Sequence, residues 1–116
     1  MEEQLRNLNK IDGVKGSAIV SNEGLMVLSL LPSSVDPDAV AGMAASNFRN
    51  SSTVAKVLNA GKTKKVIIET DTDFIIFTTI GNGFLAVISD KNVNLGLLKI
   101  RIEKAVKEIK AKILEG

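Results

Sequence analysis

Hydrophobic residues along this chain recur at two spacings, one typical of helices and one typical of buried strands. Leu5, Leu8 and Ile11 stand at helical spacing near the start, and a longer series with the same period runs from Leu95 to Ile113. Short continuous apolar runs between these segments indicate strands. The pattern predicts a helix at 2–10, strands at 14–21 and 25–31, a helix at 38–60, strands at 65–70, 74–80 and 84–89, and a last helix from about 94.

Short polar breaks predict how the strands connect. Asn22-Glu23-Gly24, Asp71-Thr72-Asp73 and Gly81-Asn82-Gly83 each separate two successive strands at hairpin distance. Because tight turns join antiparallel neighbours, the sheet is expected to be mainly antiparallel. The break at Ser89-Asp90-Lys91-Asn92 joins the last strand to the last helix.

The strands carry apolar residues on both faces, which predicts a layered fold. In the fourth strand, Ile75 and Phe77 point one way while Phe74, Ile76 and Thr78 point the other. An antiparallel sheet usually leaves one face in water, so a sheet that is apolar on both faces requires helices on both sides. We therefore predict one α+β domain over residues 1–116, an α/β/α sandwich with a five-stranded antiparallel sheet in the order α-β-β-α-β-β-β-α.

The middle helix is rich in small residues on more than one side. Ser34 or Asp36 is available to cap its start, and Gly61 is placed to cap its end. Its periodic apolar positions are Val40, Met43, Ala44, Phe48, Ala55 and Leu58, with Val54 and Val57 widening the stripe. One stripe can pack on the sheet, and the small residues elsewhere permit close approach of a second helix.

The strand at 65–70 starts the second group of strands and is expected at a sheet edge. An apolar edge such as Val66-Ile67-Ile68 favours pairing with another chain, although Lys64 and Lys65 could act as gatekeepers against it. Together, this edge and the middle helix predict a homodimer. The predicted interface residues are Ala41, Met43, Ala44, Phe48, Ser51, Val66, Ile67 and Ile68.

Composition narrows the available chemistry. The chain has no cysteine and no histidine, which excludes disulfides, thiolate metal sites and the commonest general base. Four phenylalanines without tyrosine or tryptophan, and a net charge of +2, argue against nucleic-acid binding. No apolar run reaches the ~18 residues that span a bilayer, and the acidic start does not fit a secretory signal. We expect a cytoplasmic protein that is not an enzyme and uses no cofactor or metal.

Local motifs have simple structural interpretations. Gly61-Lys62-Thr63 resembles the end of a phosphate-binding loop, but it lacks the earlier glycine and follows a helix instead of a strand. Asp71 with Asp73, and Asp36 with Asp38, are interpreted as solvated turn residues because no third ligand stands nearby.

The outer face of the last helix is basic. It carries Lys99, Arg101, Lys104, Lys107, Lys110 and Lys112. Glu103 and Glu108 interrupt this series and are expected to pair at i,i+4 spacing with Lys107 and Lys112, so a solvated helix face is the favoured interpretation over binding of acidic lipid or nucleic acid.

Three segments carry a family resemblance: IDGVKGSAIVSNEGLMVLS at 11–29, VIIET at 66–70 and FLAVISDKNVNLGLLKIRIEKAV at 84–106. In these segments the chain resembles the roadblock/dynein light chain domain family, as a stand-alone member of prokaryotic type. The resemblance covers nearly the whole chain and implies a profilin-like fold that dimerises through the middle helix and the third strand. The positions that match the family's fold determinants are Gly13, Gly16, Gly24, Asn94, Leu95 and Gly96.

The resemblance also implies a function. Family members are non-catalytic modules that bind or regulate Ras-like small GTPases, so the expected role is a dimeric regulator or scaffold that binds such a GTPase and can stimulate its GTP hydrolysis. An activator that supplied an arginine would have to use Arg6, Arg49 or Arg101, and only Arg49 lies on the middle helix. A dimer surface that holds the GTPase is therefore expected in place of an arginine finger.

Several alternatives stay open. The chain could be a purely structural adaptor subunit of a motor, trafficking or signalling complex, with no effect on GTP hydrolysis. A paralogue could replace one copy to form a heterodimer. A small-molecule sensor of similar layered shape is disfavoured because no polar residues converge within an apolar pocket pattern.

Overall fold

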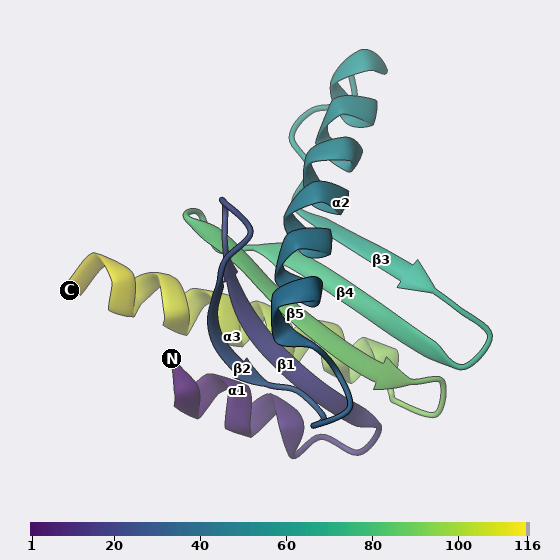
Figure 1. Ribbon diagram of the computed structural model, residues 1–116, viewed down its shortest axis with the longest axis vertical. Coiled ribbons are helices and arrows are strands. Elements are labelled where there is room, and N and C mark those ends of the chain that lie inside the picture. Colours follow the sequence, from purple (N-terminus) through teal and green to yellow (C-terminus); the bar gives the residue numbers. More distant parts are fainter. Residues whose placement is uncertain (116) are drawn as a thin grey trace.

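The structure, a computed structural model, describes residues 1–115, with side chains through residue 113. Residue 116, the last of the predicted domain, lies outside the described residues. Three helices and five strands follow one another in the predicted order (Figure 1). They are α1 (Glu2–Asn9), β1 (Val14–Ser21), β2 (Met26–Leu30), α2 (Pro37–Val57), β3 (Lys65–Glu69), β4 (Asp73–Thr79), β5 (Gly83–Asp90) and α3 (Leu95–Glu115).

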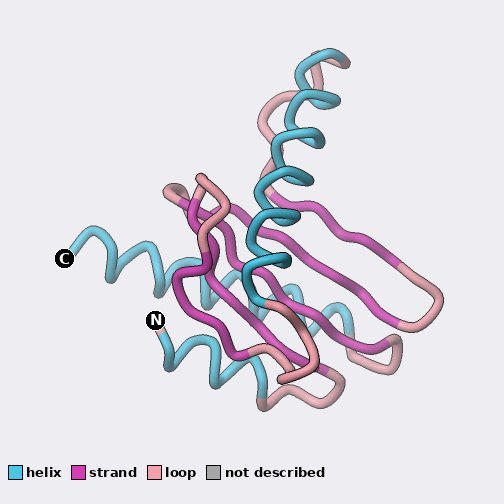
Figure 2. Tube along the Cα trace, in the orientation of Figure 1, coloured by secondary structure: helices cyan, strands magenta, loops and turns pink. Residues whose placement is uncertain are grey.

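The five strands form one sheet in the order β2-β1-β5-β4-β3, and all neighbours are antiparallel. α2 carries the chain from the β2 edge to the β3 edge, as the tube in Figure 2 shows. The prediction that the strand at 65–70 lies at a sheet edge is therefore confirmed.

Helices cover both faces of the sheet, which confirms the predicted three-layer α+β fold. α1 and α3 lie on one face, and α2 crosses the other (Figure 1). Alternation along β4 places Ile76 in the core beneath α1 and α3, and Phe77 in the core beneath α2. The first core contains mainly Leu and Ile, whereas the second contains Phe48, Phe77, Phe84 and several alanines.

A β-bulge shapes the β2 edge. Ile19 pairs with Leu28 while the next residue, Val20, pairs with Met26, so Val27 is the extra residue. The bulge puts Leu28 in the core beneath α1 and α3 and Met26 in the core beneath α2, although the two residues have the same parity. It also shortens the regular part of this edge strand, a common protection against edge pairing.

Capping residues set the ends of α2. The Asp36 side chain accepts a hydrogen bond from the Asp38 backbone N–H at 3.0 Å, as one of the two predicted caps. At the other end, the Asn59 N–H bonds to the Lys56 carbonyl and the Ala60 N–H to the Ala55 carbonyl, which is the Schellman arrangement. The prediction that Gly61 caps this helix is wrong, because Asn59 adopts the left-handed conformation (φ 53°) and ends the helix at Val57.

Polar contacts fix α1 on the sheet. The Ser17 hydroxyl donates to the Asn9 side-chain oxygen at 2.7 Å, and the Asn9 amide donates to the Leu30 carbonyl at 2.9 Å. Leu5 and Leu8 are buried beneath the helix. α1 is therefore held in a defined position beside α3.

Candidate interaction surfaces

The inner side of α2 packs closely on the sheet. Ala41, Ala44 and Ala45 are buried there, and the Phe48 ring lies 4.6 Å from the Phe84 ring, measured between centroids. Because alanine side chains are short, the helix can lie near the sheet, and one phenylalanine fills the remaining depth. This side of α2 is complete within a single chain.

The opposite side of α2 carries large apolar residues in water. Val54 and Val57 follow Met43 by about three and four helical turns, so all three point the same way, with Leu58 beside them. Their exposed fractions are 63% for Met43, 58% for Val54, 74% for Val57 and 69% for Leu58. We call these four residues the outer face of α2. In Figure 1 the C-terminal half of the helix projects past the sheet.

The β3 edge continues this surface. Within residues 1–115, β4 is the only strand that pairs with β3, so the other side of β3 keeps unpaired backbone groups. Val66 and Ile68 pack under α2, whereas Ile67 pairs with Ile76 on the face of α3 and is 37% exposed. Lys65 begins the strand.

The structure sorts the predicted interface residues by exposure. Met43 and Ile67 are exposed; Ser51, Val66 and Ile68 are half-buried; Ala41, Ala44 and Phe48 are buried against their own sheet. The last three side chains cannot contact a second chain in this conformation. The surface that remains for a partner consists of the outer face of α2 and the β3 edge.

Sequence reasoning placed Val54, Val57 and Leu58 in the stripe that packs on the sheet, and this assignment is wrong. All three are exposed on the outer face. At 100° per residue, Val54, Val57 and Leu58 fall on the same side of the helix as Met43, whereas Ala41, Ala44 and Phe48 fall on the other side. The sequence spacing therefore distinguishes the two sides of the helix.

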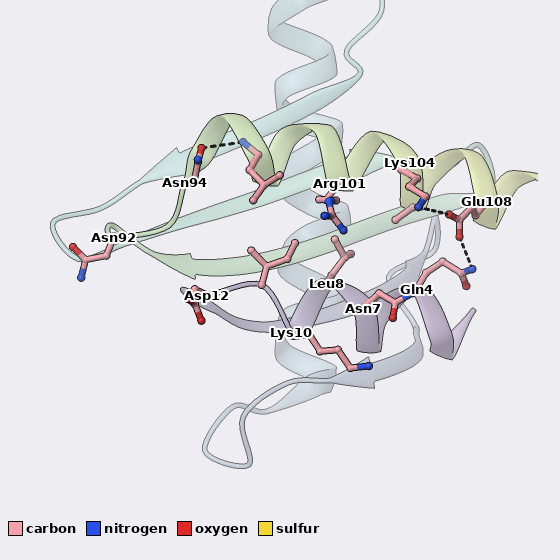
Figure 3. A pocket seen from close by; sticks show the side chains of 13 residues that line it. Gln4, Asn7, Leu8, Lys10, Asp12, Asn92, Asn94, Arg101, Lys104 and Glu108 are labelled. Atoms are coloured by element: carbon pink, nitrogen blue, oxygen red, sulfur yellow. Dashed lines mark hydrogen bonds and ion pairs between the residues drawn. The ribbon is translucent and has the colours of Figure 1, made fainter.

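A second surface feature lies between α1 and α3. It is an open groove of about 660 Å³, and we call it the α1/α3 groove (Figure 3). Leu8, Ile11, Leu97 and Ala105 give it apolar walls. Lys10, Arg101 and Lys104 add positive charge, and Asp12 and Glu108 add negative charge.

Gln4 organises one end of this groove. It is only 4% exposed, and its amide nitrogen donates to a Glu108 carboxylate oxygen at 3.0 Å. The Lys104 ammonium lies 4.0 Å from the other oxygen of the same carboxylate. Sequence analysis missed Gln4, although it precedes Leu8 by four positions and therefore shares its helix face.

The predicted fold determinants have different surroundings. Gly13 (φ 95°) leaves no room for a Cβ, which would stand 2.9 Å from Asp90 Oδ1, and a Cβ on Gly16 would stand 3.1 Å from the Leu30 carbonyl oxygen. Gly24 has φ 85°, whereas a Cβ on Gly96 would meet only Asn94 Oδ1, at an ordinary 3.6 Å. Asn94 accepts a hydrogen bond from the Leu97 N–H at 3.0 Å and so caps the start of α3.

Leu95, the remaining predicted determinant, begins α3 and packs half-buried against the core beneath α1 and α3.

Other candidate groups have local partners. Asp73 forms an ion pair with Lys15 at 2.9 Å, and the Thr53 hydroxyl donates to the Arg49 carbonyl at 3.1 Å. The Lys15 hydrogen bond holds the pKa of Asp73 below its ordinary value. The described part of the chain contains no group of three or more His, Cys, Asp or Glu side chains placed to bind a metal ion. None of the helices in residues 1–115 has the length and apolar character that a membrane crossing requires.

Comparison with known proteins agrees with this architecture. The Roadblock/LC7 domain family matches residues 1–90, from α1 through β5. The predicted determinants Asn94, Leu95 and Gly96 lie beyond that span. Two proteins of Methanocaldococcus jannaschii, both described as uncharacterised, are each 37% identical over 107 residues, which cover 92% of this chain and 94% of each relative.

Solved structures extend the likeness to the whole chain. Myxococcus xanthus MglB has a TM-score of 0.85 at 28% identity, covering 94% of this chain and 83% of that chain. Acanthamoeba castellanii profilin IA has a TM-score of 0.66 at 13% identity, covering 96% and 94%, which confirms the profilin-like fold. Because the family matches three quarters of the chain and the relatives nearly all of it, the chain belongs to the Roadblock/LC7 domain family.

Proposed function

We propose that this protein is a homodimer joined through the outer face of α2 and the β3 edge. The observation that carries the proposal is the outer face of α2, whose four large apolar side chains are more than half exposed while the inner side is already packed. Val54, Val57 and Leu58 follow one another closely at the end of the helix, with Met43 about three turns earlier, and exposed apolar side chains gathered on one side of a helix mark an interaction surface. A two-fold axis lets the same helix serve both copies, and the unpaired β3 edge adds backbone hydrogen bonds.

The proposed role of this dimer is to bind and regulate a Ras-like small GTPase in the cytoplasm. Membership of the Roadblock/LC7 family, whose members are generally non-catalytic regulators, and the likeness to MglB support this role. The dimer contributes no cofactor and no catalytic group. It holds the GTPase in a geometry in which the GTPase's own residues hydrolyse GTP faster.

Two of the three arginines lie away from the proposed dimer surface. Arg6 is paired with Glu2 at 2.8 Å, and Arg101 lies in the α1/α3 groove on the other face of the sheet. Arg49 is exposed on α2, so it is the arginine nearest to the proposed dimer surface.

Replacement of Met43 by Asp tests the dimer. Each copy would bury an unpaired carboxylate at the interface, a cost of about 3 kcal/mol or more, so the dissociation constant should rise about 100-fold or more. Light scattering and sedimentation measure this constant. Ile100→Asp is the matched control, because Ile100 is 64% exposed, close to the 63% of Met43, but lies on α3 on the opposite face of the sheet, and it should leave the dimer intact. A wild-type chain that stays monomeric at micromolar concentration, or a Met43→Asp variant that dimerises normally, overturns the proposed interface.

GTP hydrolysis tests the regulatory role. Ras-like GTPases of the source organism are assayed alone, with the wild-type chain and with Met43→Asp. We expect the wild-type dimer to bind one of them and raise its hydrolysis rate, and the variant to lose the effect. Binding without a change in rate assigns the adaptor role instead, and no binding to any of them overturns both.

A further inference from the structure

The α1/α3 groove lies on the face of the sheet opposite to α2 (Figures 1 and 3). It therefore stays open when the outer face of α2 is covered by a second copy. Leu8 and Ala105 are buried at its base and Leu97 is 39% exposed at its rim. A groove with an apolar base and a few charged groups at its rim is typical of binding sites for ligands and peptides.

Among residues 1–115, Arg101 and Lys10 are the two cations of this groove that form no ion pair. Figure 3 shows the Arg101 side chain extending from α3 toward Leu8 on α1. Glu108 follows Arg101 by about 10 Å along the helix, and Gln4 and Lys104 already hold its carboxylate. The Arg101 guanidinium therefore offers its donors to whatever occupies the groove.

The charge pattern indicates which kind of occupant fits. Asp12 and Glu108 also line the groove, and their carboxylates would repel a phosphate-rich polymer or an anionic membrane. A ligand with one carboxylate between apolar groups avoids this repulsion and pairs with Arg101 in a bidentate geometry. Apolar anchors with an acidic residue are what an amphipathic peptide presents when it lies in a groove between helices.

We propose that the α1/α3 groove binds an acidic amphipathic segment of a partner protein, with one carboxylate of the segment on Arg101 and its apolar side chains against Leu8, Ile11 and Leu97. This inference does not depend on the GTPase proposal. In a dimer joined through α2, each copy would keep its own groove, so the assembly would hold two such segments while its other surface stays engaged. The basic face of α3 would also attract an acidic partner at long range.

Selection from a random peptide library displayed on phage tests the occupant. The bait is the full chain, and the enriched peptides are synthesised and titrated against it by fluorescence anisotropy. We expect enriched peptides that combine apolar residues with Asp or Glu. Replacing the acidic residue by its amide should weaken binding about tenfold or more, the range for a hydrogen bond to a charged group.

Two charge-reversal variants locate the site. Arg101→Glu should abolish binding of the enriched peptides, whereas Lys107→Glu removes the same charge from the exposed side of α3, outside the groove, and should leave binding nearly unchanged. Both positions are exposed, so both variants should fold. Amide signals of the ¹⁵N-labelled wild-type chain should shift at Asn7, Leu8 and Leu97 but not on α2.

Several results would overturn the inference. These are the absence of any enriched peptide, retention of the peptides by Arg101→Glu, or shifts confined to α2. Displacement of the peptides by inorganic phosphate or acetate at equal concentration would reduce the groove to a small-anion site. Binding to phosphatidylserine vesicles is a further test. If Lys107→Glu weakened this binding as much as Arg101→Glu, the result would show a general charge effect in place of a peptide site.

Discussion

The two long helices cover opposite faces of the same sheet and have the same length of 21 residues, but most of their large apolar side chains point in opposite directions relative to the sheet. α3 turns Leu98, Ile102 and Ile109 toward the sheet, and each is at most 2% exposed. α2 turns three alanines and Phe48 toward the sheet and leaves Met43, Val54, Val57 and Leu58 in water.

The large aliphatic series of α3 is therefore packed within a single chain, whereas the outer face of α2 is left exposed by a single chain. The burial of large aliphatic side chains gives α3 its stability, at about 1.5–3 kcal/mol for each. α2 gains less from its small inner residues, and its outer apolar groups gain nothing until a partner covers them. The comparison supports a structural role for α3 and an interaction role for α2.

The largest effect is expected from truncating α3 in the core. Leu98→Ala should lower the free energy of unfolding by about 2–5 kcal/mol because it leaves a cavity under the helix. Val57→Ala on α2 should change the stability of the monomer by less than about 0.5 kcal/mol. Urea unfolding followed by circular dichroism, at concentrations where the chain is monomeric, measures both. Equal losses would show that the outer face of α2 is packed within one chain.

A smaller loss is expected from enlarging the inner side of α2. Ala44→Leu should destabilise the chain by about 1–3 kcal/mol because Ala44 has no exposed surface and the helix would have to move away from the sheet. Ala39→Leu makes the same change at an exposed position and should be nearly neutral. If Ala44→Leu were also neutral, the close approach of α2 to the sheet would not matter for stability.

Gly42 lies on the exposed side of α2, and its replacement should stabilise the chain. A Cβ at this position meets nothing within 4 Å, so Gly42→Ala should gain about 0.5–1 kcal/mol from the higher helix propensity of alanine. Gly61→Ala is the contrasting change, because Gly61 has φ 89° and alanine would be strained there. Thermal unfolding measures both changes. A loss of stability in Gly42→Ala would contradict the open space that surrounds position 42.

Much of the fold could be predicted because local patterns and tertiary packing agree. The periodic aliphatic series of α3, which includes Leu98, Ile102 and Ile109, faces the sheet, so its burial follows from its spacing, whereas Leu97 and Ile100 lie off this series and are exposed. The strands were identified by continuous apolar runs, and the hairpin turns between them set an antiparallel sheet. The ends of α2 were harder to place: Asn59 and Gly61 can both adopt positive φ, and only the Schellman hydrogen bonds of the folded chain show that Asn59 is used.

The interaction surface was harder to predict because apolar residues surround α2. Met43 and Ala44 are adjacent in sequence and both hydrophobic, yet one is exposed and the other is buried. The depth available between helix and sheet decides which one turns inward, and that depth depends on Phe48 and Phe84. The α1/α3 groove could not be predicted for a similar reason, since it exists only where two helices distant in sequence lie side by side.

The smallest effect concerns an ion pair on the side of the sheet that α2 covers. Alternation puts Asp73 on the face opposite to Phe74, and Lys15 on β1 bonds to it at 2.9 Å across β5. The hydrogen bond from Lys15 lowers the pKa of Asp73 below its ordinary value of 3.8, so the ionised form is favoured in the folded state. The pair should therefore stabilise the fold at pH values above 3.8, and this contribution should disappear as the pH falls through the lowered pKa.

Melting temperatures of the wild-type chain and Asp73→Asn, measured from neutral pH down to pH values below 3.8, test this sign. The variant should melt slightly lower at neutral pH and converge with the wild type in acid, where the Asp73 carboxylate is protonated. Asp71→Asn is the control, because Asp71 is an exposed carboxylate of the same turn and forms no ion pair within residues 1–115. Its melting temperature should show no such convergence with the wild type in acid. A difference that grows in acid would mean that the charged form of Asp73 destabilises the folded chain relative to the protonated form.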